Sequence, residues 1–502
     1  MMQEEQARAR KMRQEMERRI YAGSMVELVE QYARTQPEKL CVADPEEQMT
    51  YAAFAARIEK KAEQLSALGI QRGDRVMAMA SQKGDYLALQ FAVHRLGAIF
   101  VPLEKNLPQE RVETIREVTQ AKLVLSNSRI QSERRSFSEE LPKPEQKATI
   151  LFTTGTTGVS KGIELSHRAE VAVAQNVFYG TEMEPDTVEL IPMPVNHSYG
   201  LRHCFGLLLG GRSVVLCDGV TMAEDFFSMM ERFGVNALSL TPAAVNILLH
   251  LTGERLGRYA ETLHYLQLGT AGVDAAMKER LRRLLPQSRL YQYYSSTEAG
   301  CACIFDFRKD YSPRRVGKPA CNSWFAVMDD NGNVIESSEK NWGYLACAGP
   351  MNMTGYYGDP ALTEKTVIDG FVCSRDIGYI DQDGYLCFVG RAGDVINTGG
   401  NKVAPEEVEE AAMFFGGIRE CACSGAEDPL LGQVPSLYIV PEEPEKPFDT
   451  VALSAFLAQR LEAYKQPRQI VLIRAVPRNY MGKPQRSRCY TAEKIEASQE
   501  KR

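Results

Sequence analysis

The sequence predicts an α/β protein, with a large N-terminal domain of helix-covered sheets, a β subdomain and a small C-terminal domain of mixed α+β type. Short apolar runs typical of strands alternate with helical periodicity between residues 51 and 268. After residue 316 the pattern changes to short strands separated by turn signals, and a further compact region begins after residue 391. A chain of 502 residues exceeds what one hydrophobic core supports, so we expect more than one domain.

The first alternating units come early in the chain. The helical pattern YAAFAARIEKKAEQLSALG at residues 51–69 leads to a strand at 75–80, a second helix and a strand at 98–103. Units of this kind predict a parallel sheet covered by helices. Residues 126–147 are polar and rich in Ser, Glu, Lys and Pro, so we expect a solvated connection there.

Strand and helix patterns then resume. Strands are expected at 213–216, 237–240 and 265–268, each followed by a helical run. Turn signals at 329–332 and 381–384 indicate the smaller β subdomain.

The C-terminal region contains a clear helix start. Pro405 suits the first helical position. Glu406, Glu407 and Glu409 follow in the first turns, where negative charge is favourable against the helix dipole. We therefore expect a helix that opens at Pro405.

Composition and charge exclude several classes of partner. The net charge is −6 at pH 7 with acidic and basic residues interspersed, so there is neither a basic footprint for nucleic acid nor a polybasic membrane patch. No apolar stretch approaches the length of about 18 residues that a membrane helix needs, so we expect no integral membrane segment. Residues 1–22 are dense in Arg, Lys and Glu and lack a signal-peptide core, which indicates a charged N-terminal extension. We expect a cytoplasmic protein whose partners are small molecules.

The 12 cysteines are scattered singly or as the alternating pairs Cys301/Cys303 and Cys421/Cys423. They form no C-x-x-C motif and have no histidine at ligand spacing. We therefore expect buried, reduced thiols rather than a structural zinc site.

The most informative segment is the run TTGTTGVSKG at residues 153–162. Glycines at positions 155, 158 and 162 permit backbone conformations that other residues resist, so amide N–H groups can converge on an anion. Lys161 supplies positive charge. We predict a loop that binds the phosphates of a nucleotide; a flexible polar surface turn is the alternative.

The surroundings of this loop favour phosphate binding. The apolar run ATILFT at 148–153 is typical of a buried strand that leads into the loop, and Ser166 can cap a following helix. Val159 and Ser160 separate the last loop glycine from the lysine, so the segment is not a Walker loop.

In this context the chain resembles the adenylate-forming superfamily, which includes acyl-CoA and aryl-CoA synthetases, adenylation domains of peptide synthetases and luciferases. Further segments resemble the other motifs of the superfamily in the same order. They are PMPVNHSYG at 192–200, YSSTE at 294–298, SRD at 374–376 with GYL at 384–386, GRAGD at 390–394 and PRNYMGK at 477–483. The resemblance implies a large ATP- and acid-binding domain at 23–390 and a small mobile domain at 391–502, which carries the catalytic lysine and rotates as a unit.

The resemblance implies that a carboxylic acid is activated with ATP and Mg²⁺. This reaction needs groups that hold the triphosphate, steer the carboxylate to the α-phosphorus and neutralise charge as pyrophosphate leaves. Lys483 is expected to bridge the carboxylate and the α-phosphate, Thr297 to bind the α-phosphate and Glu298 to hold Mg²⁺. The expected ATP-binding residues are Thr153, Thr154, Gly155, Thr156, Thr157, Gly158, Lys161, Ala271, Gly272, Tyr294, Ser295, Thr297, Asp376, Arg391 and Lys483.

Within that set, the nucleoside has its own expected contacts. Tyr294 offers a flat face to the adenine, and the segment GTAG at 269–272 approaches the base through its backbone. Asp376 resembles the ribose-binding aspartate, which accepts hydrogen bonds from both hydroxyls, and Arg391 assists it.

The acid is expected beside His197, which the resemblance also implies is catalytic. The expected pocket residues are His197, Ser198, Tyr199, Thr241, Ala243, Gly269, Thr270 and Tyr293. No acidic residue surrounds His197 that could pair with an ammonium group, so an amino acid substrate is disfavoured. The pocket suits an uncharged aliphatic or aromatic carboxylic acid.

The second half-reaction needs a thiol. TGGNKVAPEE at 398–407 resembles the segment in which Gly399 and Gly400 border the tunnel for a phosphopantetheine arm. CoA and acyl carrier proteins share this arm, and the lack of a fused carrier domain favours CoA.

Four positions bear on how closely the chain follows the superfamily pattern. Ser295 replaces the usual glycine, and Tyr293 precedes the motif where a small residue is common, so the pocket is expected to be shorter or more polar. Arg375 replaces glycine before Asp376. Gly393 stands at the hinge position, where many relatives carry Asp or Lys, and glycine absorbs dihedral change freely.

Three alternatives to a CoA ligase remain open from the sequence. One is a stand-alone adenylating enzyme that loads a phosphopantetheine carrier protein. The second is a non-catalytic nucleotide-binding relative, suggested by Ser295, Arg375 and Gly393. The third is a phosphotransferase that produces ADP, against which the absence of a Walker or kinase signature counts.

Overall fold

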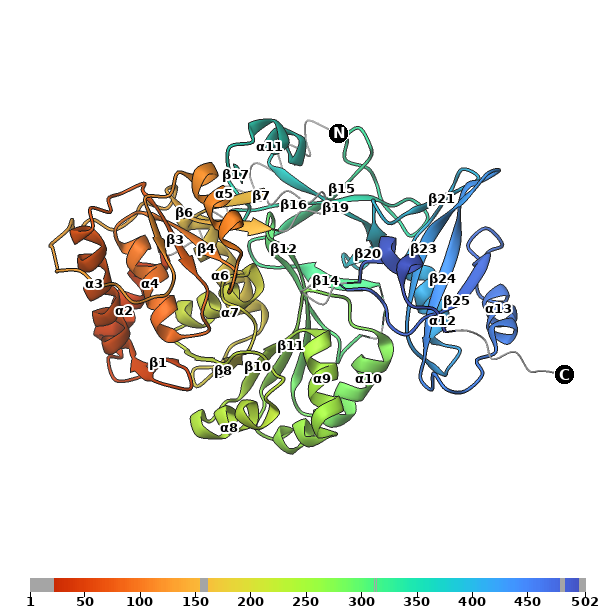
Figure 1. The fold of residues 1–502 in the computed structure, drawn as a ribbon, viewed down its shortest axis with the longest axis horizontal. Helices are drawn as coiled ribbons and strands as arrows, with labels where there is room; N and C mark the ends of the chain where they lie inside the picture. The colour runs from red at the N-terminus through yellow and green to blue at the C-terminus, as the bar shows by residue number, and fades with distance from the viewer. Residues whose placement is uncertain (1–21, 154–160, 311, 313, 479–483, 496–502) are drawn as a thin grey trace. The chain divides into compact units, whose positions relative to one another are not determined.

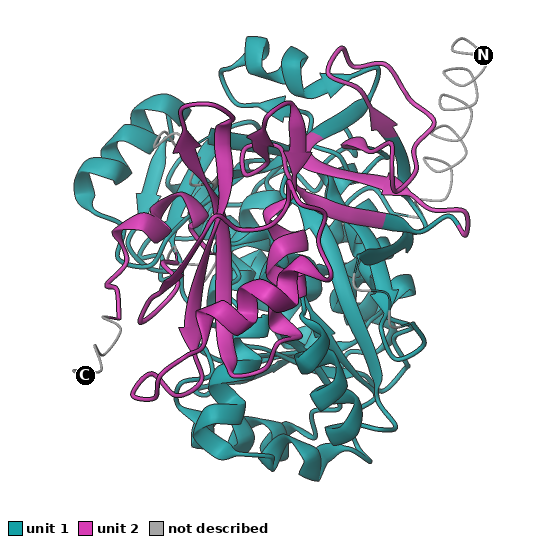
Figure 2. Ribbon diagram, turned by 90° about the vertical axis from the view of Figure 1, so that its right-hand side faces the viewer, with its two compact units in different colours: residues 1–326, 346–373, 384–386 teal, residues 327–345, 374–383, 387–502 magenta. Residues whose placement is uncertain are grey.

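The computed structural model describes residues 22–153, 161–310, 312, 314–478 and 484–495. The chain divides into two compact units, which Figure 2 shows in different colours. Unit 1 consists of Met1–Ala326, Ala346–Cys373 and Gly384–Leu386, and unit 2 of Val327–Leu345, Ser374–Asp383 and Cys387–Arg502. The predicted domain boundaries after residues 22 and 390 remain predictions, and residues 1–21 of the expected extension lie outside the described residues.

Unit 1 begins with alternating helices and strands (Figure 1). Its first elements are α2 (Met25–Thr35), β1 (Leu40–Ala43), β2 (Gln48–Thr50), α3 (Tyr51–Ala67), β3 (Arg75–Met79), α4 (Gly84–Arg95), β4 (Ile99–Leu103), α5 (Gln109–Thr119), β5 (Leu123–Leu125), β6 (Lys147–Thr153), β7 (Lys161–Ser166) and α6 (His167–Gly180). They are followed by β8 (Val188–Ile191), α7 (Ser198–Leu209), β9 (Ser213–Leu216), α8 (Ala223–Phe233), β10 (Ala237–Leu240), α9 (Pro242–Thr252), η1 (Arg255–Tyr259), β11 (Tyr265–Leu268), α10 (Ala275–Leu284), β12 (Arg289–Ser296), β13 (Gly300–Asp306) and β14 (Arg315–Pro319).

The chain then passes between the units several times. This part contains β15 (Trp324–Met328), β16 (Gly343–Ala348), β17 (Gly355–Tyr356), α11 (Pro360–Thr366), β18 (Val367–Ile368), β19 (Phe371–Ile380) and β20 (Leu386–Arg391). The rest of unit 2 contains β21 (Ile396–Thr398), β22 (Asn401–Val403), α12 (Pro405–Met413), β23 (Ile418–Asp428), β24 (Gly432–Pro441), α13 (Thr450–Ala458), β25 (Gln469–Leu472) and η2 (Arg486–Thr491).

One sheet of unit 1 has the strand order β17-β7-β6-β4-β3-β5. Strands β5, β3, β4 and β6 run parallel, as the predicted strand–helix units require, whereas β7 returns antiparallel to β6. Helix α4 is buried on all sides over residues 86–95, because its sequence is apolar around nearly the whole helix. The expected connection at residues 126–147 has neither helix nor strand over 126–146 and is mostly exposed, although Ser128 and Ile130 are buried and Lys147 already belongs to β6.

Unit 1 also contains part of a 14-stranded sheet, in the strand order β14-β13-β12-β11-β10-β8-β9-β1-β2. Strands β12, β11, β10, β8, β9 and β1 are parallel, so their carboxyl ends lie at the same edge. Strands β13 and β2 are antiparallel additions. The predicted α/β class is confirmed, with a mixed rather than wholly parallel sheet.

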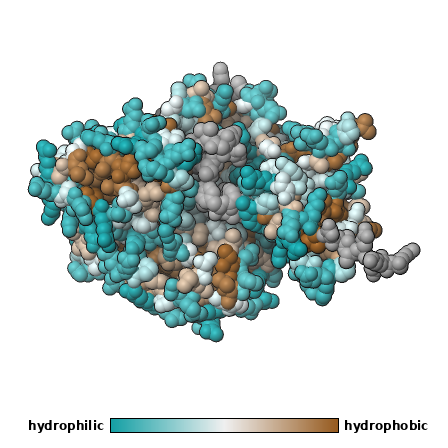
Figure 3. Space-filling view, viewed as in Figure 1, coloured by the Kyte–Doolittle hydropathy of each residue, from teal (hydrophilic) through white to brown (hydrophobic). Residues whose placement is uncertain are grey.

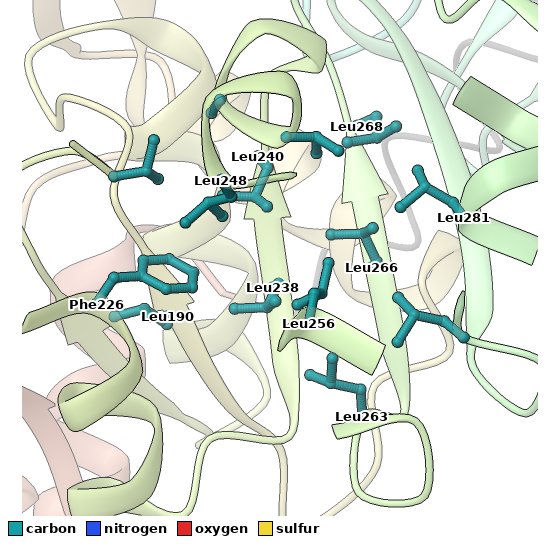
Figure 4. Packing of buried hydrophobic residues seen from close by; sticks show 14 of the residues in the cluster. Leu190, Phe226, Leu238, Leu240, Leu248, Leu256, Leu263, Leu266, Leu268 and Leu281 are labelled. Carbon is teal, nitrogen blue, oxygen red and sulfur yellow. The ribbon is translucent and has the colours of Figure 1, made fainter. Parts of the chain in front are cut away.

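Helices α8, α9 and α10 cover one face of this sheet (Figure 1). Their apolar sides meet Leu238 and Leu240 of β10 and Leu266 and Leu268 of β11 in one continuous hydrophobic cluster (Figure 4). The cluster includes Phe226, which is 1% exposed. Burial of such a side chain contributes about 1.5–3 kcal/mol, so this cluster fixes the strands whose ends carry the candidate site.

Unit 2 contains a sheet of order β22-β21-β24-β23, with β25 paired to β24. Helices α12 and α13 pack on it through Val408, Ala412, Leu453 and Leu457, which share a buried cluster with strand residues. Helix α12 begins at Pro405 with Glu406 and Glu407 in its first turn, as predicted.

The face drawn in Figure 3 is mostly hydrophilic, with several separate hydrophobic patches. Among the described residues, no helix is both long and apolar enough to cross a bilayer. All 12 cysteines are free; Cys321 is exposed, Cys373 and Cys421 are half-buried and the others are buried. The prediction of mainly buried, reduced thiols is confirmed.

Candidate functional site

The loops that follow β8, β10, β11 and β12 leave one edge of the parallel strands of unit 1. In open α/β sheets, ligands bind outside the carboxyl ends of the strands. The residues expected to line the acid pocket lie at this edge, on the loops, in the first turns of the helices after them or at the end of β12. They are His197, Ser198, Tyr199, Thr241, Ala243, Gly269, Thr270 and Tyr293.

His197 is the N-cap residue of α7, and its side chain makes no capping hydrogen bond. Burial lowers the pKa of its imidazole, with a smaller opposing effect from Glu104, so the ring is neutral near pH 7. A neutral imidazole can orient a carboxylic acid through one N–H without adding a charge.

The turn before His197 is held tightly. The Gln82 amide donates to the carbonyls of Ile191 and Met193 at 2.9 and 2.8 Å, and its oxygen accepts from Val195 N–H at 3.2 Å. At Gly200, a Cβ would lie 2.6 Å from the Pro194 carbonyl oxygen, so no side chain fits there. The backbone geometry therefore presets the position of His197.

Tyr199 and Tyr293 form an aromatic wall beside this turn. Their ring centroids are 5.6 Å apart at an interplanar angle of 68°, an edge-to-face arrangement. The Tyr199 hydroxyl donates to the Leu240 carbonyl at 3.2 Å. A Cβ at Gly269 would lie 2.4 Å from Tyr199 Cε2, so this glycine is required for the wall to form.

A buried polar network supports the wall. The His203 ring packs against Tyr199 and Tyr293, with centroids at 4.9 and 5.7 Å. His203 Nδ1 lies 2.9 Å from Glu189 Oε1, and the hydroxyls of Ser239 and Tyr265 also donate to that carboxylate. Burial alone would raise the pKa of Glu189, but His203 and the two hydroxyls outweigh burial and lower it. The Glu189 carboxylate is therefore charged, fully hydrogen-bonded and able to hold His203 in place. The available sequence signal for this residue was a single Glu in the apolar strand VELI.

The loop after β11 contains an unusual backbone conformation. Thr270 has φ +73°, a left-handed value that costs a residue with a branched Cβ of order 1–3 kcal/mol. Such strain is concentrated at functional sites, which agrees with the expectation that residues 269–272 approach a ligand through their backbone. Ala271 is half-buried and Gly272 exposed.

The end of β12 bends between Tyr294 and Ser295, where the register to β13 shifts. A bulge of this kind redirects successive side chains. Ser295 lies outside the left-handed region, so replacing the glycine of the superfamily pattern causes no backbone strain. The Tyr294 ring packs near Phe325, with centroids 6.5 Å apart.

Arg202 holds the turn that carries Thr297. Its guanidinium donates to the carbonyls of Ser296 and Thr297 at 2.8 and 3.0 Å, and the Thr297 hydroxyl lies 3.2 Å from that of Ser198. Arg202 is 3% exposed, and burial lowers its pKa. Sequence reasoning missed this residue; the signal was an arginine four positions after Ser198 in a mostly apolar helix.

Glu298 belongs to a second cluster in unit 1. The Tyr356 hydroxyl donates to Glu298 Oε1 at 3.0 Å, and Lys161 Nζ lies 5.7 Å from the centroid of the Tyr356 ring. Outer hydrogen bonds of this type orient carboxylates that ligate metals, so Glu298 fits the role of a Mg²⁺ ligand. The sequence analysis did not identify Tyr356. This residue lies in β17, which pairs with β7, and its sequence signal is the run GYYG at 355–358.

Strands β6 and β7 bring the two ends of the expected phosphate loop together, because Thr153 pairs with Lys161. Thr154, Gly155, Thr156, Thr157 and Gly158 lie outside the described residues. The expectation for Gly162 was wrong. This glycine lies in β7, its φ is not left-handed, and a Cβ there would approach Ile150 Cγ2 at 3.0 Å, so it serves close packing rather than loop conformation.

In unit 2, the predicted ribose-binding pair is brought together. Arg391 Nε lies 3.2 Å from Asp376 Oδ1. Within β19, the Asp376 N–H donates to the Ser374 hydroxyl. At the end of β20, the Ala392 N–H donates to the Arg375 carbonyl of β19, which keeps Arg391 beside Asp376. The Arg375 side chain is exposed.

The expected hinge and CoA-binding residues are also in unit 2. Gly399 and Gly400 form the two-residue turn between β21 and β22, with φ +55° and +85°. A turn of this type needs positive φ at both residues, which favours glycine. Gly393 has no left-handed φ, and a Cβ there would meet nothing within 4 Å. Packing therefore does not require a glycine at position 393.

Lys483 lies outside the described residues, but the chain on both sides of it is anchored. Gln485 N–H donates to the Pro477 carbonyl at 2.7 Å. Arg486 forms ion pairs with Asp394, Glu406 and Glu409 at 3.1, 2.9 and 2.7 Å. Arg486 is a further residue that sequence reasoning missed.

The chain matches the family model described as AMP-binding enzyme at residues 29–140 and 128–357, and the AMP-binding enzyme C-terminal domain at 407–483. A feruloyl-CoA synthase from Amycolatopsis sp is 27% identical over 482 residues, which cover 90% of this chain and 95% of the relative. A 2-succinylbenzoate–CoA ligase from Bacillus subtilis (strain 168) is 26% identical over 488 residues, which cover 93% and 98%.

Solved structures show the same fold. ATP-bound MatB from Rhodopseudomonas palustris superposes with a TM-score of 0.83 at 23% identity, over 92% of this chain and 97% of that one. The o-succinylbenzoate CoA synthetase MenE from Bacillus subtilis, in complex with its acyl-adenylate intermediate, gives 0.80 at 24% identity, over 93% and 99%. A further structure of MenE contains ATP and a magnesium ion.

Proposed function

The chain belongs to the AMP-binding enzyme family, and from this premise we propose that it is an ATP-dependent carboxylic acid:CoA ligase. In the first half-reaction, a carboxylate oxygen attacks the α-phosphorus of ATP, acyl-AMP forms and pyrophosphate leaves. In the second, the thiol of CoA attacks the acyl carbonyl, a thioester forms and AMP leaves.

One observation carries this proposal. The feruloyl-CoA synthase and the 2-succinylbenzoate–CoA ligase from Bacillus subtilis match the chain over 90% and 93% of its length, and over 95% and 98% of their own. A match of this extent includes the candidate acid site at the carboxyl ends of the parallel strands of unit 1. It also includes the C-terminal region, and both half-reactions need both parts.

The residues at the site have chemically suitable roles. Thr297 supplies a hydroxyl for the α-phosphate, and Arg202 keeps its turn in place through two carbonyls. Glu298, oriented by Tyr356, would hold Mg²⁺, which supplies charge neutralisation for the phosphates. Asp376 offers a carboxylate to the ribose hydroxyls, with Arg391 beside it. Lys483 and the loop from Thr154 to Gly158 keep the roles that the superfamily pattern implies.

We propose an uncharged aliphatic or aromatic acid as the substrate, apart from its reacting carboxylate. None of the eight expected pocket residues is Lys or Arg, and His197 is neutral near pH 7 because burial lowers its pKa. A second carboxylate would therefore lose hydration without gaining a cationic partner from these residues. The rings of Tyr199 and Tyr293 favour aromatic acids as the first compounds to test.

The test is pyrophosphate release with Mg²⁺-ATP across a panel of aliphatic and aromatic acids, with and without CoA, together with identification of the nucleotide product. We expect AMP and pyrophosphate only with certain acids, and faster turnover with CoA. Acid-dependent pyrophosphate without CoA stimulation would replace CoA by a carrier protein as acceptor. ADP as product, or no acid-dependent turnover, would contradict the proposal.

A variant separates the two half-reactions. Lys483→Ala is expected to reduce adenylation by about 100-fold or more, because it removes charge stabilisation at the reacting phosphate. Thioester formation from a supplied acyl-adenylate should remain. Lys494→Ala, at an exposed lysine nearby in sequence, is the matched control and should leave both steps unchanged. Equal loss of both half-reactions in Lys483→Ala would contradict this division of roles.

A further inference from the structure

Unit 1 contains a buried cluster of metal-ligating side chains that the proposed reaction does not use. His94 lies in the last turn of α4, His167 and Glu170 lie in the first turn of α6, and Thr149 lies in β6. All four are at most 1% exposed. One ligand atom each from His94, His167 and Glu170 lies within 4.8 Å of the others.

The cluster leaves several polar atoms without hydrogen-bond partners among the described residues. They are His94 Nδ1, both ring nitrogens of His167 and Glu170 Oε2. Each unsatisfied buried polar group costs about 1–3 kcal/mol, so a concentration of four in one place requires a physical explanation.

Hydrogen bonds from Thr149 orient two of the side chains. Its hydroxyl donates to Glu170 Oε1 at 2.6 Å, and its oxygen lies 3.2 Å from His94 Nε2. With a metal bound, His94 would keep its proton on Nε2 toward Thr149 and offer the lone pair of Nδ1. Glu170 Oε2 also has no hydrogen-bond partner among the described residues, and it lies 3.7 Å from His94 Nδ1.

A metal ion between these two atoms would satisfy both of them. A separation of 3.7 Å is too long for a shared proton, since hydrogen bonds end near 3.2 Å. Ligands about 2.0–2.1 Å from a tetrahedral Zn²⁺ are about 3.4 Å apart, which is close to the observed spacing. The His167 ring, with its centroid 5.2 Å from that of His94, offers the third ligand, since one nitrogen of this ring lies within 4.8 Å of the other two ligand atoms.

We propose that His94, His167 and Glu170 form a structural site for a divalent transition-metal ion, with Zn²⁺ as the ion that fits best. Two imidazoles and one carboxylate are a common zinc ligand set, and Thr149 provides the outer hydrogen bonds that fix ligand orientation in metal sites. The site differs from the proposed Mg²⁺ position at Glu298, for which only oxygen ligands are proposed.

The ionisation state of the ligands is compatible with this site. Burial lowers the pKa of His167 to about 3, with a smaller contribution from Arg72, and burial also lowers the pKa of His94. Both imidazoles are therefore neutral and ready to bind a metal. Burial raises the pKa of Glu170 to about 8, so the metal would displace one proton from this carboxyl.

The metal would brace the strand that leads into the expected phosphate loop. Thr149 lies in β6, four residues before Thr153, and the ligands come from the two helices packed beside that strand. Because the ligands are buried, the metal would enter during folding and resist removal by chelators from the native protein.

The test is elemental analysis of the purified 502-residue protein, expressed with zinc and dialysed against EDTA. We expect about one zinc per chain in the wild type and less than about one tenth in Glu170→Gln and His167→Gln. The control is His264→Ala, in a cluster of the same ligand types in which Glu184 and His264 are half-buried and Asp186 is exposed; this variant should retain the metal. Wild-type protein without stoichiometric metal, or an undiminished content in Glu170→Gln, would overturn the proposal.

Two measurements remain informative if those variants fold poorly. Thr149→Val keeps all three ligands and is expected to weaken zinc affinity about 10–100-fold, because it removes only the outer hydrogen bonds. The Co²⁺-substituted wild type should show tetrahedral d–d bands without thiolate-to-cobalt charge transfer. A thiolate signature would place the metal on the cysteines instead. Unchanged zinc affinity in Thr149→Val would show that the hydrogen bonds of Thr149 do not orient metal ligands.

Discussion

The carboxylate of Glu298 depends on a neighbouring hydroxyl for its orientation. We expect Tyr356→Phe to raise the KM for Mg²⁺-ATP about 10-fold, because loss of the outer partner of a metal-ligating carboxylate typically costs about 10–100-fold. Pyrophosphate release at varied Mg²⁺-ATP measures the effect. Tyr357→Phe is the control, since that hydroxyl donates to the Thr119 carbonyl at 3.2 Å instead. A wild-type KM in Tyr356→Phe would separate Tyr356 from the metal site.

The pairing of Asp376 with Arg391 makes a second prediction at this scale. Asp376→Ala should weaken ATP binding at least about 10-fold, because hydrogen bonds to a charged group contribute about 1.5–3 kcal/mol each. Titration calorimetry with ATP, without acid, measures the affinity. Arg375→Ala changes the neighbouring exposed side chain and should have little effect. If both variants bind ATP equally well, the ribose contacts must lie elsewhere.

At the scale of elements, the loop after β11 is specified by packing against α7. Gly269→Ala would place a methyl 2.4 Å from Tyr199 Cε2 and force the ring to move. We expect a destabilisation of about 1–3 kcal/mol, typical of overpacking, and a raised KM for the acid. Urea unfolding and steady-state kinetics measure the two effects.

Gly272 is the matched control in the same loop. A Cβ there meets nothing within 4 Å and its φ is not left-handed, so Gly272→Ala should leave stability and KM nearly unchanged. Equal effects of the two substitutions would show that the aromatic wall does not constrain Gly269.

At the scale of the whole molecule, Asp85 ties separate segments together. Its carboxylate accepts from Arg57 and Lys61 of α3 at 2.8 and 3.0 Å and from Ser128, in the long connection, at 2.6 Å. Burial tends to raise the pKa of Asp85, but the Ser128 hydroxyl and the two cations outweigh it and lower the pKa. The stabilisation is therefore present above the unfolded pKa of about 3.9 and is lost as the pH falls through the folded pKa.

We expect Asp85→Asn to destabilise the protein by about 3 kcal/mol at neutral pH, because Lys61 is left buried without its charged partner. The difference from wild type should shrink as the pH falls below the unfolded pKa of about 3.9 and vanish below the lower pKa of the folded carboxyl. Urea midpoints at several pH values measure this. Glu46→Gln, in the exposed pair with Lys83, should change stability by less than about 1 kcal/mol. A difference that persists at low pH would contradict the electrostatic explanation.

Local patterns were sufficient to predict much of the fold. The helix from Tyr51, the strands β10 and β11 and the start of α12 at Pro405 lie where periodicity and capping preferences indicate. Ser166 caps α6 as expected, with its hydroxyl accepting from the Ala169 N–H. These features depend on residues a few positions apart, so the sequence itself contains the relevant interactions.

Part of the candidate site could not be predicted in this way. Arg202 acts through the carbonyl of Thr297, 95 positions further along the chain, and Tyr356 acts through Glu298, 58 positions before it. At Gly162 the local pattern suggested a loop residue, whereas the structure places this glycine in close packing contact with Ile150. No local pattern contains these partners.

The sequence by itself determined the α/β class, the order of the elements and the family, because periodicity and ordered motifs are local properties. Only the tertiary structure decided which side chains meet at the strand edge and which buried groups gather around Thr149. The physical reason is that a buried polar group must be satisfied by whatever partner the packing of helices and strands brings within hydrogen-bond distance. That partner is set by the fold, not by proximity along the chain.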